Sequence, residues 1–457
     1  METTIAAIST AMSASGIGII RISGENAMDV ISRIYRSKGG KKKIKEVPTH
    51  TIHYGYIYDG EELIDEVLVM IMHAPRTFTG EDTVEIDCHG GVYAMQRVLD
   101  TVLKNGAEIA EPGEFTKRAF LNGRMDLSQA EAVMDVIQAK NEYALRSSMD
   151  RLRGSVQKAI RDIREKLIYH IAYIESALDD PEHISLDGYP QELLEVVDNE
   201  QKEVKRLLKT SSDGKMIQEG IQTVILGKPN AGKSSLLNLL IGENRAIVTD
   251  IAGTTRDILE EYITLHGISL KIIDTAGIRE TKDIVEKIGV DRAREMAQKA
   301  DLILYVVDSS VPLDENDEEI MEMLTGKKAI ILYNKTDLQP EIQPEILKEK
   351  TGHPVIPISA KEEKGITELE EQIKDMFFGG EISFNDEVYI TNARHKAALE
   401  EADRSLDLVR NSIEMGMPED FFSIDLMNAY ENLGKILGES VGEDLVNEIF
   451  SKFCMGK

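Results

Sequence analysis

The sequence predicts a multidomain protein of mixed α/β and α+β type: an N-terminal α+β domain, a discontinuous helical domain, and a mostly parallel α/β domain inserted into it. Three observations lead to this prediction. The 457 residues are too many for one hydrophobic core. Short apolar strands mix with helices up to about residue 120, and apolar stripes with helical spacing stand on both sides of a central strand–loop–helix pattern. The expected domains are 1–120, 121–220 and 379–457 for the two helical parts, and 221–378 for the inserted domain.

The composition limits the classes to which the protein can belong. Its 42% apolar content is that of an ordinary globular protein. Two cysteines, Cys88 and Cys454, provide no disulfide framework and suit a reducing compartment. No basic segment precedes a long apolar one near Met1, and no apolar run approaches the roughly 20 residues that span a bilayer. We therefore expect a cytoplasmic protein without a membrane-spanning segment.

Strands mixed with helices predict that the N-terminal domain is α+β. In its last strand, Val84, Ile86 and Cys88 alternate with Glu85 and Asp87, which indicates one apolar and one polar face. The strands expected here are 5–8, 18–22, 53–57, 66–72 and 84–88, and the helices are 29–35 and 93–104.

The next part of the chain has helical character. Residues 128–180 almost lack glycine and proline, and their apolar residues recur at steps of three and four, which predicts a long amphipathic helix. A second helix is expected at 191–210, and similar stripes return after residue 380. Because neither half can bury its stripe alone, we expect one helical domain interrupted by an insertion. The first stripe consists of Val156, Ile160, Ile163, Leu167, Ile171, Ile174 and Leu178.

A phosphate-binding loop is predicted at residues 227–234, Gly-Lys-Pro-Asn-Ala-Gly-Lys-Ser. An apolar strand, 222–226, precedes it and a helical pattern follows, which disfavours an ordinary glycine-containing turn. The glycines let backbone N–H groups face a phosphate at the N-terminus of the helix. Lys233 is expected to reach the β- and γ-phosphates and the Ser234 hydroxyl to bind Mg²⁺.

Three further motifs follow at the ends of predicted strands. In Asp274-Thr275-Ala276-Gly277, a carboxylate can hold the water of the metal and a glycine can meet the γ-phosphate. In Asn334-Lys335-Thr336-Asp337, the last carboxylate can accept hydrogen bonds from guanine N1–H and N2–H₂, a pair that adenine does not offer. Ser359-Ala360-Lys361 suits the guanine O6. Because open parallel sheets bind ligands at the carboxyl ends of their strands, the four motifs together predict a GTP-binding domain.

The machinery for hydrolysis is less obvious. Many small GTPases place a glutamine directly after the Asp-x-x-Gly motif to orient water, but this chain has Ile278 there. Another device is required, or hydrolysis is very slow. The Gly/Thr-rich loop 249–257 lies where the first switch must be, and a threonine in it can complete the Mg²⁺ shell.

Outside these motifs, four segments resemble the MnmE (TrmE) family of tRNA modification GTPases. They are 18–24, 78–91, 112–123 and 453–457, the last of which resembles the Cys-x-Gly-Lys ending of the family. The resemblance covers essentially the whole chain. It implies an N-terminal domain that resembles folate-binding aminomethyltransferases, binds 5-formyl- or 5,10-methylene-tetrahydrofolate and mediates homodimerisation.

The resemblance also implies a reaction and partners. A partner, MnmG, brings FAD and NADH in a heterotetramer, and together they install a carboxymethylaminomethyl or aminomethyl group at C5 of the wobble uridine of tRNA. By motif position, the folate contacts fall on Arg21, Glu85, Arg124 and Lys457. Some members have lysine where this chain has Arg124, and the two cations bind with different geometry. The alternatives are a surface ion pair for Arg21, solvent exposure for Glu85, and simple packing rather than catalysis for Cys454.

For hydrolysis, the resemblance implies that Thr255 completes the Mg²⁺ shell and that Glu286 orients the attacking water once two G domains dimerise. The alternative for Glu286 is an exposed helix residue beside Lys287. A K⁺ held by Asn230, Thr249, Ile251 and Thr254 acts where an arginine finger would otherwise act. The expected catalytic residues are Lys233, Asp274 and Glu286. The residues expected to bind GTP are Asn230, Ala231, Gly232, Lys233, Ser234, Ser235, Thr249, Thr254, Thr255, Asp274, Thr275, Ala276, Gly277, Asn334, Lys335, Asp337, Ser359, Ala360 and Lys361.

Binding of tRNA must use a local basic surface, because a net charge of −28 argues against general nucleic-acid binding. One candidate is 38–45, and the alternative for each candidate is a solvated charged face. The other is a helix that carries Arg146, Arg151, Arg153, Lys158, Arg161, Arg164 and Lys166. Two other functions compete with tRNA modification: a regulatory G protein that docks a partner such as the ribosome, and a folate-dependent one-carbon transferase that uses the G domain as a switch. The segments around Arg21 and Glu85 and the C-terminal Cys-Met-Gly-Lys favour tRNA modification over the regulatory G protein.

Overall fold

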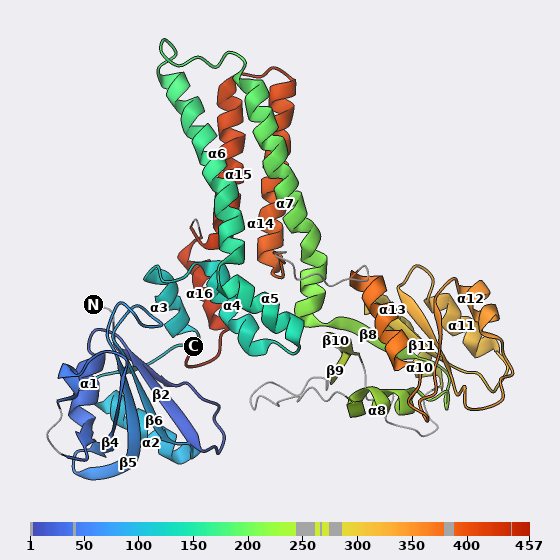
Figure 1. Ribbon diagram of the computed structural model, residues 1–457, viewed down its shortest axis with the longest axis horizontal. Helices are drawn as coiled ribbons and strands as arrows, with labels where there is room; N and C mark the ends of the chain where they lie inside the picture. The colour runs from blue at the N-terminus through green and yellow to red at the C-terminus, as the bar shows by residue number, and fades with distance from the viewer. Residues whose placement is uncertain are drawn as a thin grey trace. The chain divides into compact units, whose positions relative to one another are not determined.

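The computed structural model describes residues 3–39, 43–243, 261–265, 267–273, 286–378, 388–439 and 441–457 (Figure 1). The chain forms two compact units, and each gathers segments that are distant in the sequence. The first unit comprises Met1–Ile137, Arg151–Pro190 and Asn411–Lys457. The second comprises Gln138–Asp150 and Gln191–Arg410.

A seven-stranded sheet forms the N-terminal part of the first unit. Its strand order is β3-β4-β5-β6-β2-β1-β7, and its pairs are antiparallel except for β1 with β7. Helices α1 (Ala27–Ile34) and α2 (Val92–Lys104) share one hydrophobic core with the sheet. The mixed arrangement confirms the predicted α+β fold. The strands are β1 (Ile5–Ile8), β2 (Ile17–Ser23), β3 (Tyr35–Ser37), β4 (Thr51–Asp59), β5 (Glu62–Met72), β6 (Thr83–His89) and β7 (Glu108–Ile109).

Alternation along β2 gives the sheet a second, separately covered face. Ile20 and Ile22 are buried in the core with α1 and α2, so Arg21 between them belongs to the opposite face. On that face, Ile5 and Ala7 of β1 pack with Phe115 of α3 (Glu114–Leu121). The strand pattern therefore places a charged side chain beneath a small apolar cover.

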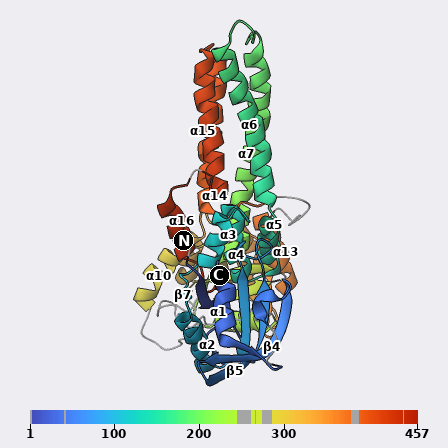
Figure 2. The same ribbon diagram turned by 90° about the vertical axis from the view of Figure 1, so that its left-hand side faces the viewer.

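Helices complete the first unit. Helices α6 (Ser155–Asp179) and α15 (Glu419–Leu437) pack along each other although about half the chain separates them (Figure 2). Their buried residues recur at steps of three and four, as expected for facing amphipathic helices. Helices α4 (Leu127–Gln138) and α16 (Glu443–Ser451) contribute to a further core with Phe450 and Phe453.

The prediction of a single long helix over 128–180 is wrong in two respects. The segment forms three helices, α4, α5 (Glu142–Leu152) and α6. The last two are separate because Gly154 between them adopts φ +96, a left-handed conformation that suits glycine. Leu178 is 44% exposed and Ala177 is buried instead, so the predicted stripe is one residue out at its end.

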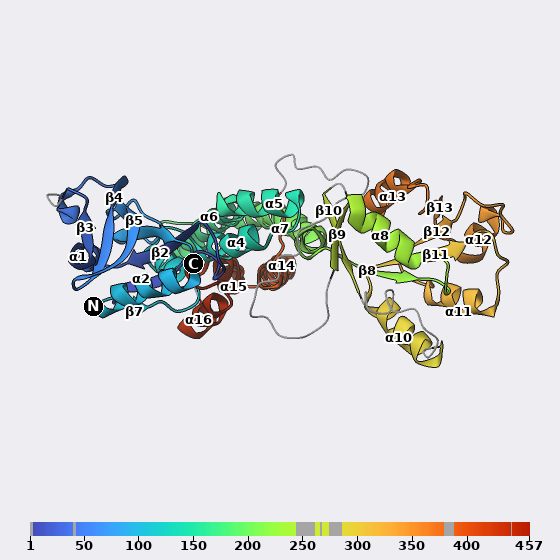
Figure 3. The same cartoon turned by 90° about the horizontal axis from the view of Figure 1, so that it is seen from below.

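The second unit contains a six-stranded sheet in the order β13-β12-β11-β8-β10-β9. Every pair is parallel except β9 with β10. Two separate cores cover its faces, one with α8 and α13 and the other with α10, α11 and α12 (Figure 3). This confirms the predicted inserted α/β domain. The elements are β8 (Ile221–Leu226), α8 (Lys233–Glu243), β9 (Glu261–Leu265), β10 (Ile268–Ile272), α10 (Glu286–Lys299), β11 (Leu302–Asp308), α11 (Glu315–Met323), β12 (Ala329–Asn334), α12 (Pro344–Thr351), β13 (Val355–Pro357) and α13 (Ile366–Phe378).

Helix α7 (Tyr189–Glu219) leads directly into this domain and is longer than the expected 191–210. It pairs with α14 (Ala393–Glu414) through Gln201, whose amide donates to Asp407 Oδ1 at 2.6 Å. The Thr210 hydroxyl donates to Val388 O and accepts from Ile390 N, which fixes the returning chain beside α7. Within the part of the chain that the structure describes, no helix is long and apolar enough to cross a membrane.

Candidate functional site

The loop between β8 and α8 passes so close to its neighbours that two of its positions require glycine. A Cβ on Gly227 would lie 2.4 Å from Val306 O, and one on Gly232 would lie 2.2 Å from Asn334 Nδ2. Both have positive φ, and so has Asn230, at +63. The loop therefore lies against the ends of β11 and β12, and α8 begins immediately after it at Lys233.

Lys233 is held over this loop by the backbone. Its ammonium donates to Gly227 O at 2.6 Å and to Lys228 O at 2.7 Å. Burial lowers the pKa of Lys233 because it disfavours the charged form. Backbone carbonyls rather than a carboxylate position this cation, so its positive charge can still be paired with an anion bound at the N-terminus of α8.

Asn334 connects three of the predicted motifs. It is 2% exposed, and its amide donates to Ala231 O in the loop at 2.8 Å. Its Oδ1 accepts a hydrogen bond from Ala360 N at 3.2 Å. The adjacent Lys335 adopts φ +65 and pairs with Asp308 at 2.5 Å. One buried amide thus holds the loop, the end of β12 and the segment after β13 together.

The residues expected to read the base lie next to this junction. Asp337 Oδ1 accepts from the Ser359 hydroxyl at 2.9 Å, and its Oδ2 lies 3.9 Å from Lys361 Nζ. The Asp337 side chain is 11% exposed and that of Lys361 is 82% exposed. The carboxylate is therefore oriented by a buried serine, while the lysine remains at the surface.

Several expected residues lie outside the described residues: Thr249, Ile251, Thr254, Thr255, Asp274, Thr275, Ala276, Gly277 and Ile278. Glu286 is the first residue of α10, and its side chain is not described. Their roles remain predictions. Among the described residues, no group of three or more His, Cys, Asp or Glu side chains could hold a metal ion.

A second polar cluster lies in the first unit, on the sheet face opposite α1 and α2. Arg21 and Glu85 are paired in register on β2 and β6, and Arg21 Nε donates to Glu85 Oε1 at 2.8 Å. Their side chains are 15% and 17% exposed. The guanidinium carbon lies 5.8 Å from the Phe78 ring centroid and 5.6 Å from that of Phe115. The surface ion pair considered as the alternative for Arg21 is thus a largely buried pair between two aromatic rings.

The C-terminal segment closes this cluster. Gly456 O accepts from Arg21 at 3.2 Å and from the Ser9 hydroxyl at 3.2 Å. Gly456 has φ +78, and a Cβ on it would lie 2.5 Å from Ile8 O. Next to it, Lys457 has a lowered pKa because burial, and then the charge of Arg21, disfavour its ammonium form. The tail therefore docks closely enough to bring its terminal lysine beside the arginine.

Arg124 completes the set of residues expected from the resemblance, since its guanidinium carbon lies 5.1 Å from the Phe78 ring. Arg21 and Arg124 both lie near that ring, and Glu85 and Lys457 lie beside Arg21. Phe78, Phe115 and Gly456 were not singled out from the sequence, although they lie in or beside the four matching segments. Their role depends on contacts across the fold, and no local spacing indicates it.

The two cysteines differ in environment. Cys88 is buried, its thiol donates to Gly18 O at 3.3 Å, and burial raises its pKa to about 12. A thiol with such a pKa is inert at neutral pH. Cys454 is exposed and free, and its backbone carbonyl accepts from Gly113 N at 3.4 Å.

The proposed basic helix is wrong in part. Its residues lie on α5, on α6 and, for Arg153, in the turn between them, and two of them are buried in ion pairs. Arg151 is 1% exposed and pairs with Asp135 at 2.7 Å, and Arg164 is 6% exposed and pairs with Glu439 at 2.5 Å. Neither side chain can meet an RNA phosphate.

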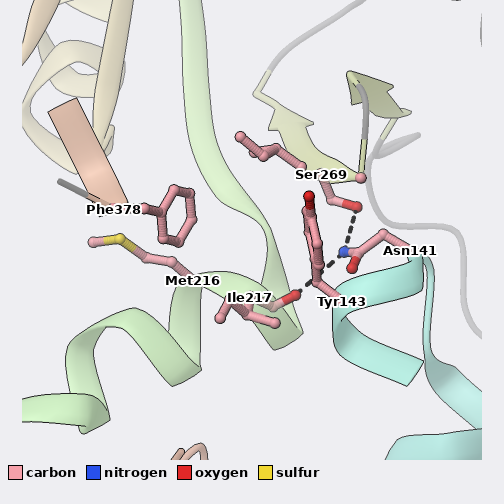
Figure 4. Close-up of a pocket in the computed structure, with 8 residues that line it drawn as sticks. Asn141, Tyr143, Met216, Ile217, Ser269 and Phe378 are labelled. Atoms are coloured by element: carbon pink, nitrogen blue, oxygen red, sulfur yellow. Dashed lines mark hydrogen bonds between the residues drawn. The ribbon is translucent and has the colours of Figure 1, made fainter. Parts of the chain in front are cut away.

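A small pocket in the second unit is a packing seam (Figure 4). Its volume is about 10 Å³, room for no more than one water. The Asn141 amide donates to Ile217 O at 3.2 Å and to the Ser269 hydroxyl at 2.8 Å, and the Tyr143 ring lies against Gly267. The seam joins the β9–β10 hairpin to α5 and to the end of α7.

Comparisons with known proteins agree across the chain. The family model of the MnmE helical domain matches residues 127–454, and that of the TrmE N-terminus matches residues 4–124. Proteins named tRNA modification GTPase MnmE are similar over 99% of this chain. The one from Lachnoclostridium phytofermentans is 60% identical over 99% of its length, and those from Geobacillus thermodenitrificans and Bacillus subtilis are 50% and 46% identical over 99% and 100% of theirs. Among solved structures, the G domain of the T. maritima FeoB iron transporter aligns with 34% of this chain and 98% of its own at 27% identity and a TM-score of 0.26.

Proposed function

The chain belongs to the MnmE family of tRNA modification GTPases, and on that premise we propose that its GTP hydrolysis serves modification of the wobble uridine. With an FAD-dependent partner of the MnmG type, it adds a carboxymethylaminomethyl or aminomethyl group to C5 of that uridine. The one-carbon unit comes from 5-formyl- or 5,10-methylene-tetrahydrofolate. The protein acts as a homodimer within a heterotetramer with this partner.

The observation that carries the nucleotide part of the proposal is the Asn334 junction. The same buried amide contacts the loop at Ala231 and the segment at Ala360, so the proposed phosphate site and base site are held next to each other. In this arrangement Lys233 binds the β- and γ-phosphates. Asp337, oriented by Ser359, accepts the guanine N1–H and N2–H₂ hydrogen bonds.

The cation sites are proposals that the described residues fit in part. Ser234, at the start of α8, and Thr255 hold Mg²⁺; Asn230, Thr249, Ile251 and Thr254 hold K⁺. Asn230 is exposed, and among the described residues its side chain has no hydrogen-bond partner, so its amide oxygen is available. Uncharged oxygens are ligands that replace the hydration shell of K⁺. When bound, the cations neutralise charge on the phosphates, while Lys233 holds the γ-phosphate and Glu286 orients water when two G domains meet.

The folate proposal is supported by the Arg21 cluster. A pterin ring and the carboxylates of a folate tail need stacking surfaces, a carboxylate and cations. Phe78, a partly buried ring near Arg21, can offer a stacking surface, and Glu85 lies beside the same arginine. Lys457 and Arg124 add positive charge, and burial of Lys457 leaves it to be stabilised by an anionic partner. The four residues Arg21, Glu85, Arg124 and Lys457 are therefore proposed to bind the folate.

The proposed function is tested by mass spectrometry of wobble uridine in a strain that lacks the gene. Wild-type protein is expected to restore the modified nucleoside, and Arg21→Ala to fail although it still hydrolyses GTP. Arg36→Ala is a matched control, because Arg36 is a half-exposed arginine of the same domain that also lies over a tyrosine ring and pairs with Glu61. Normal modification without the protein would exclude the reaction, and full tetrahydrofolate affinity of Arg21→Ala/Glu85→Ala in calorimetry would exclude the folate site.

A further inference from the structure

The side chain of Lys228, the second residue of the nucleotide loop, forms ion pairs with two carboxylates of a neighbouring helix. Its Nζ lies 2.6 Å from Asp317 Oδ2 and 3.0 Å from Asp314 Oδ2, both at the beginning of α11. The side chains of Lys228 and Asp317 are 15% and 2% exposed. Burial lowers the pKa of Lys228, but its hydrogen bonds to Asp317 and Asp314 outweigh burial and raise it, so the lysine stays charged.

Further hydrogen bonds hold the Asp317 carboxylate in place beside this lysine. The carboxylate also accepts from the hydroxyl of fully buried Tyr305 at 2.7 Å and from Asp314 N at 3.0 Å. Asp314 and Asp317 form a capping box at the N-terminus of α11, so strand β11 and helix α11 both fix the carboxylate. Because a buried carboxylate without a counter-charge is costly, Lys228 is the partner that satisfies it.

The anchored residue also supplies the backbone contacts that shape the loop. Lys228 O accepts from Lys233 Nζ at 2.7 Å and from Ala231 N at 3.3 Å. The side chain of residue 228 is therefore tied to α11 while its carbonyl holds the turn of the loop and the phosphate-binding lysine. A loop held in place before the ligand arrives loses less conformational freedom on binding.

From these contacts we propose that Lys228 and Asp317, backed by Tyr305, form a tether that positions the nucleotide loop, with Lys228 as a positioning residue for nucleotide binding. The inference rests on the proposed binding of GTP at residues 227–234. It predicts that the tether sets nucleotide affinity and leaves the chemical step largely unchanged.

The test measures the Kd for a fluorescent GDP analogue, together with KM and kcat for GTP, on the full chain. Lys228→Met is expected to raise Kd about tenfold, which corresponds to about 1.4 kcal/mol. Its KM is expected to rise while kcat stays within about twofold of wild type, the pattern of lost uniform binding. Lys228→Arg retains the ion pair and is expected to recover most of the affinity. Lys350→Met is the control. It removes an exposed 3.3 Å pair between Lys350 of α12 and Glu318 of α11, the helix that also carries Asp317, and should leave Kd, KM and kcat unchanged.

Asp317→Asn separates positioning from charge. If Lys228 acts only through its charge on the phosphates, its release from Asp317 leaves GDP affinity unchanged or strengthens it. If the tether positions the loop, affinity falls as in Lys228→Met. Tyr305→Phe removes one hydrogen bond from Asp317 and keeps the Lys228 pair, so it is expected to raise Kd by less than Lys228→Met does.

Wild-type GDP affinity in Lys228→Met, or unchanged or tighter GDP binding in Asp317→Asn, would overturn the tether. Should Asp317→Asn fail to fold, the comparison of Lys228→Met with Lys228→Arg decides alone, because equal Kd values for the two also overturn it. If the wild-type chain itself does not bind GDP, the nucleotide assignment fails rather than the tether.

Discussion

The two candidate sites differ in how far along the chain their residues lie from each other. In the nucleotide loop, Lys233 donates to carbonyls of Gly227 and Lys228, only six and five residues before it. In the other cluster, Arg21 contacts Glu85, 64 residues away, and Gly456, 435 residues away. The first site is shaped by glycines and a helix start that neighbour each other in the sequence. The second exists only when the sheet has formed and the C-terminal segment has docked on it.

This contrast implies that the two activities can be lost separately, and the largest effect is expected at the C-terminal segment. Removal of residues 454–457 takes away both the Gly456 carbonyl and Lys457 beside Arg21. We expect modification of wobble uridine to be lost, while GTP turnover stays within about twofold because the sites are independent. Nucleoside analysis and phosphate release on the same preparations check this. Met455→Ala, at an exposed side chain, is the control. Loss of GTP turnover in the truncated chain would show that the sites are coupled.

The nucleotide site should in turn depend on a monovalent cation. Ile278 cannot orient water, and an arginine finger is worth about 10³–10⁵ in rate, so loss of a substituting K⁺ should cost a comparable factor. We expect turnover to fall by about 10³ or more when Na⁺ replaces K⁺ at matched ionic strength. Asn230→Ala and Glu286→Ala are expected to be slow in both salts. Equal wild-type rates in the two salts would exclude the cation mechanism, and normal turnover of Glu286→Ala would exclude its role with water.

Base recognition offers a smaller and more specific change. In Asp337→Asn, one of the two acceptors becomes a donor, which leaves a guanine N–H unpaired and costs roughly 1–3 kcal/mol in GTP affinity. The variant is expected to bind xanthosine triphosphate better than wild type does, because xanthine offers an acceptor at that position. Titration with both nucleotides checks the prediction, and each nucleotide is the control for the other. Unchanged GTP affinity would mean that Asp337 does not contact the base.

The smallest effect is expected at the packing seam of the second unit. Asn141 Oδ1 accepts a hydrogen bond from Ala144 N at 2.7 Å at the beginning of α5. The Asn141 side-chain N–H groups donate to Ile217 O and to the Ser269 hydroxyl. Asn141→Ala removes a helix cap and two further hydrogen bonds and is expected to lower the free energy of unfolding by about 1–2 kcal/mol. Thermal unfolding measures this. Asn105→Ala removes the hydrogen bond that the side-chain amide donates to Thr101 O at the end of α2, in the other unit, and shows whether the loss belongs to the seam. No change in the unfolding of Asn141→Ala would mean that the seam does not contribute to stability.

The sequence predicted the local features better than those that depend on distant contacts. The loop at 227–234 and its flanking strand and helix follow from spacing alone, because each rests on neighbouring residues. The mostly parallel sheet follows from the four motifs at the ends of predicted strands. The break at Gly154 was missed because apolar spacing continued through it, although the glycine itself was visible. Arg151 and Arg164 were taken as surface charges because their partners, Asp135 and Glu439, are defined only by helix packing.

The Arg21 cluster could likewise not be predicted from local spacing in the sequence. Arg21, Glu85, Arg124 and Lys457 were named only through the family resemblance, since no spacing in the sequence connects them. Phe78 and Phe115 were missed for a further reason. An aromatic residue near a predicted strand is expected to be core, and its position over a guanidinium depends on the folded sheet face.

The docking of Gly456 against Ile8 and Ser9 also has a consequence for biosynthesis. Domains fold largely in the order in which they leave the ribosome. The sheet that carries Lys233 and Asp337 has all its strands once residue 357 has emerged, long before synthesis ends. The Arg21 cluster has to wait for Gly456 and Lys457, which are synthesised after every strand of that sheet. A chain cut short before Gly456 would therefore still bind nucleotide and lack the other site.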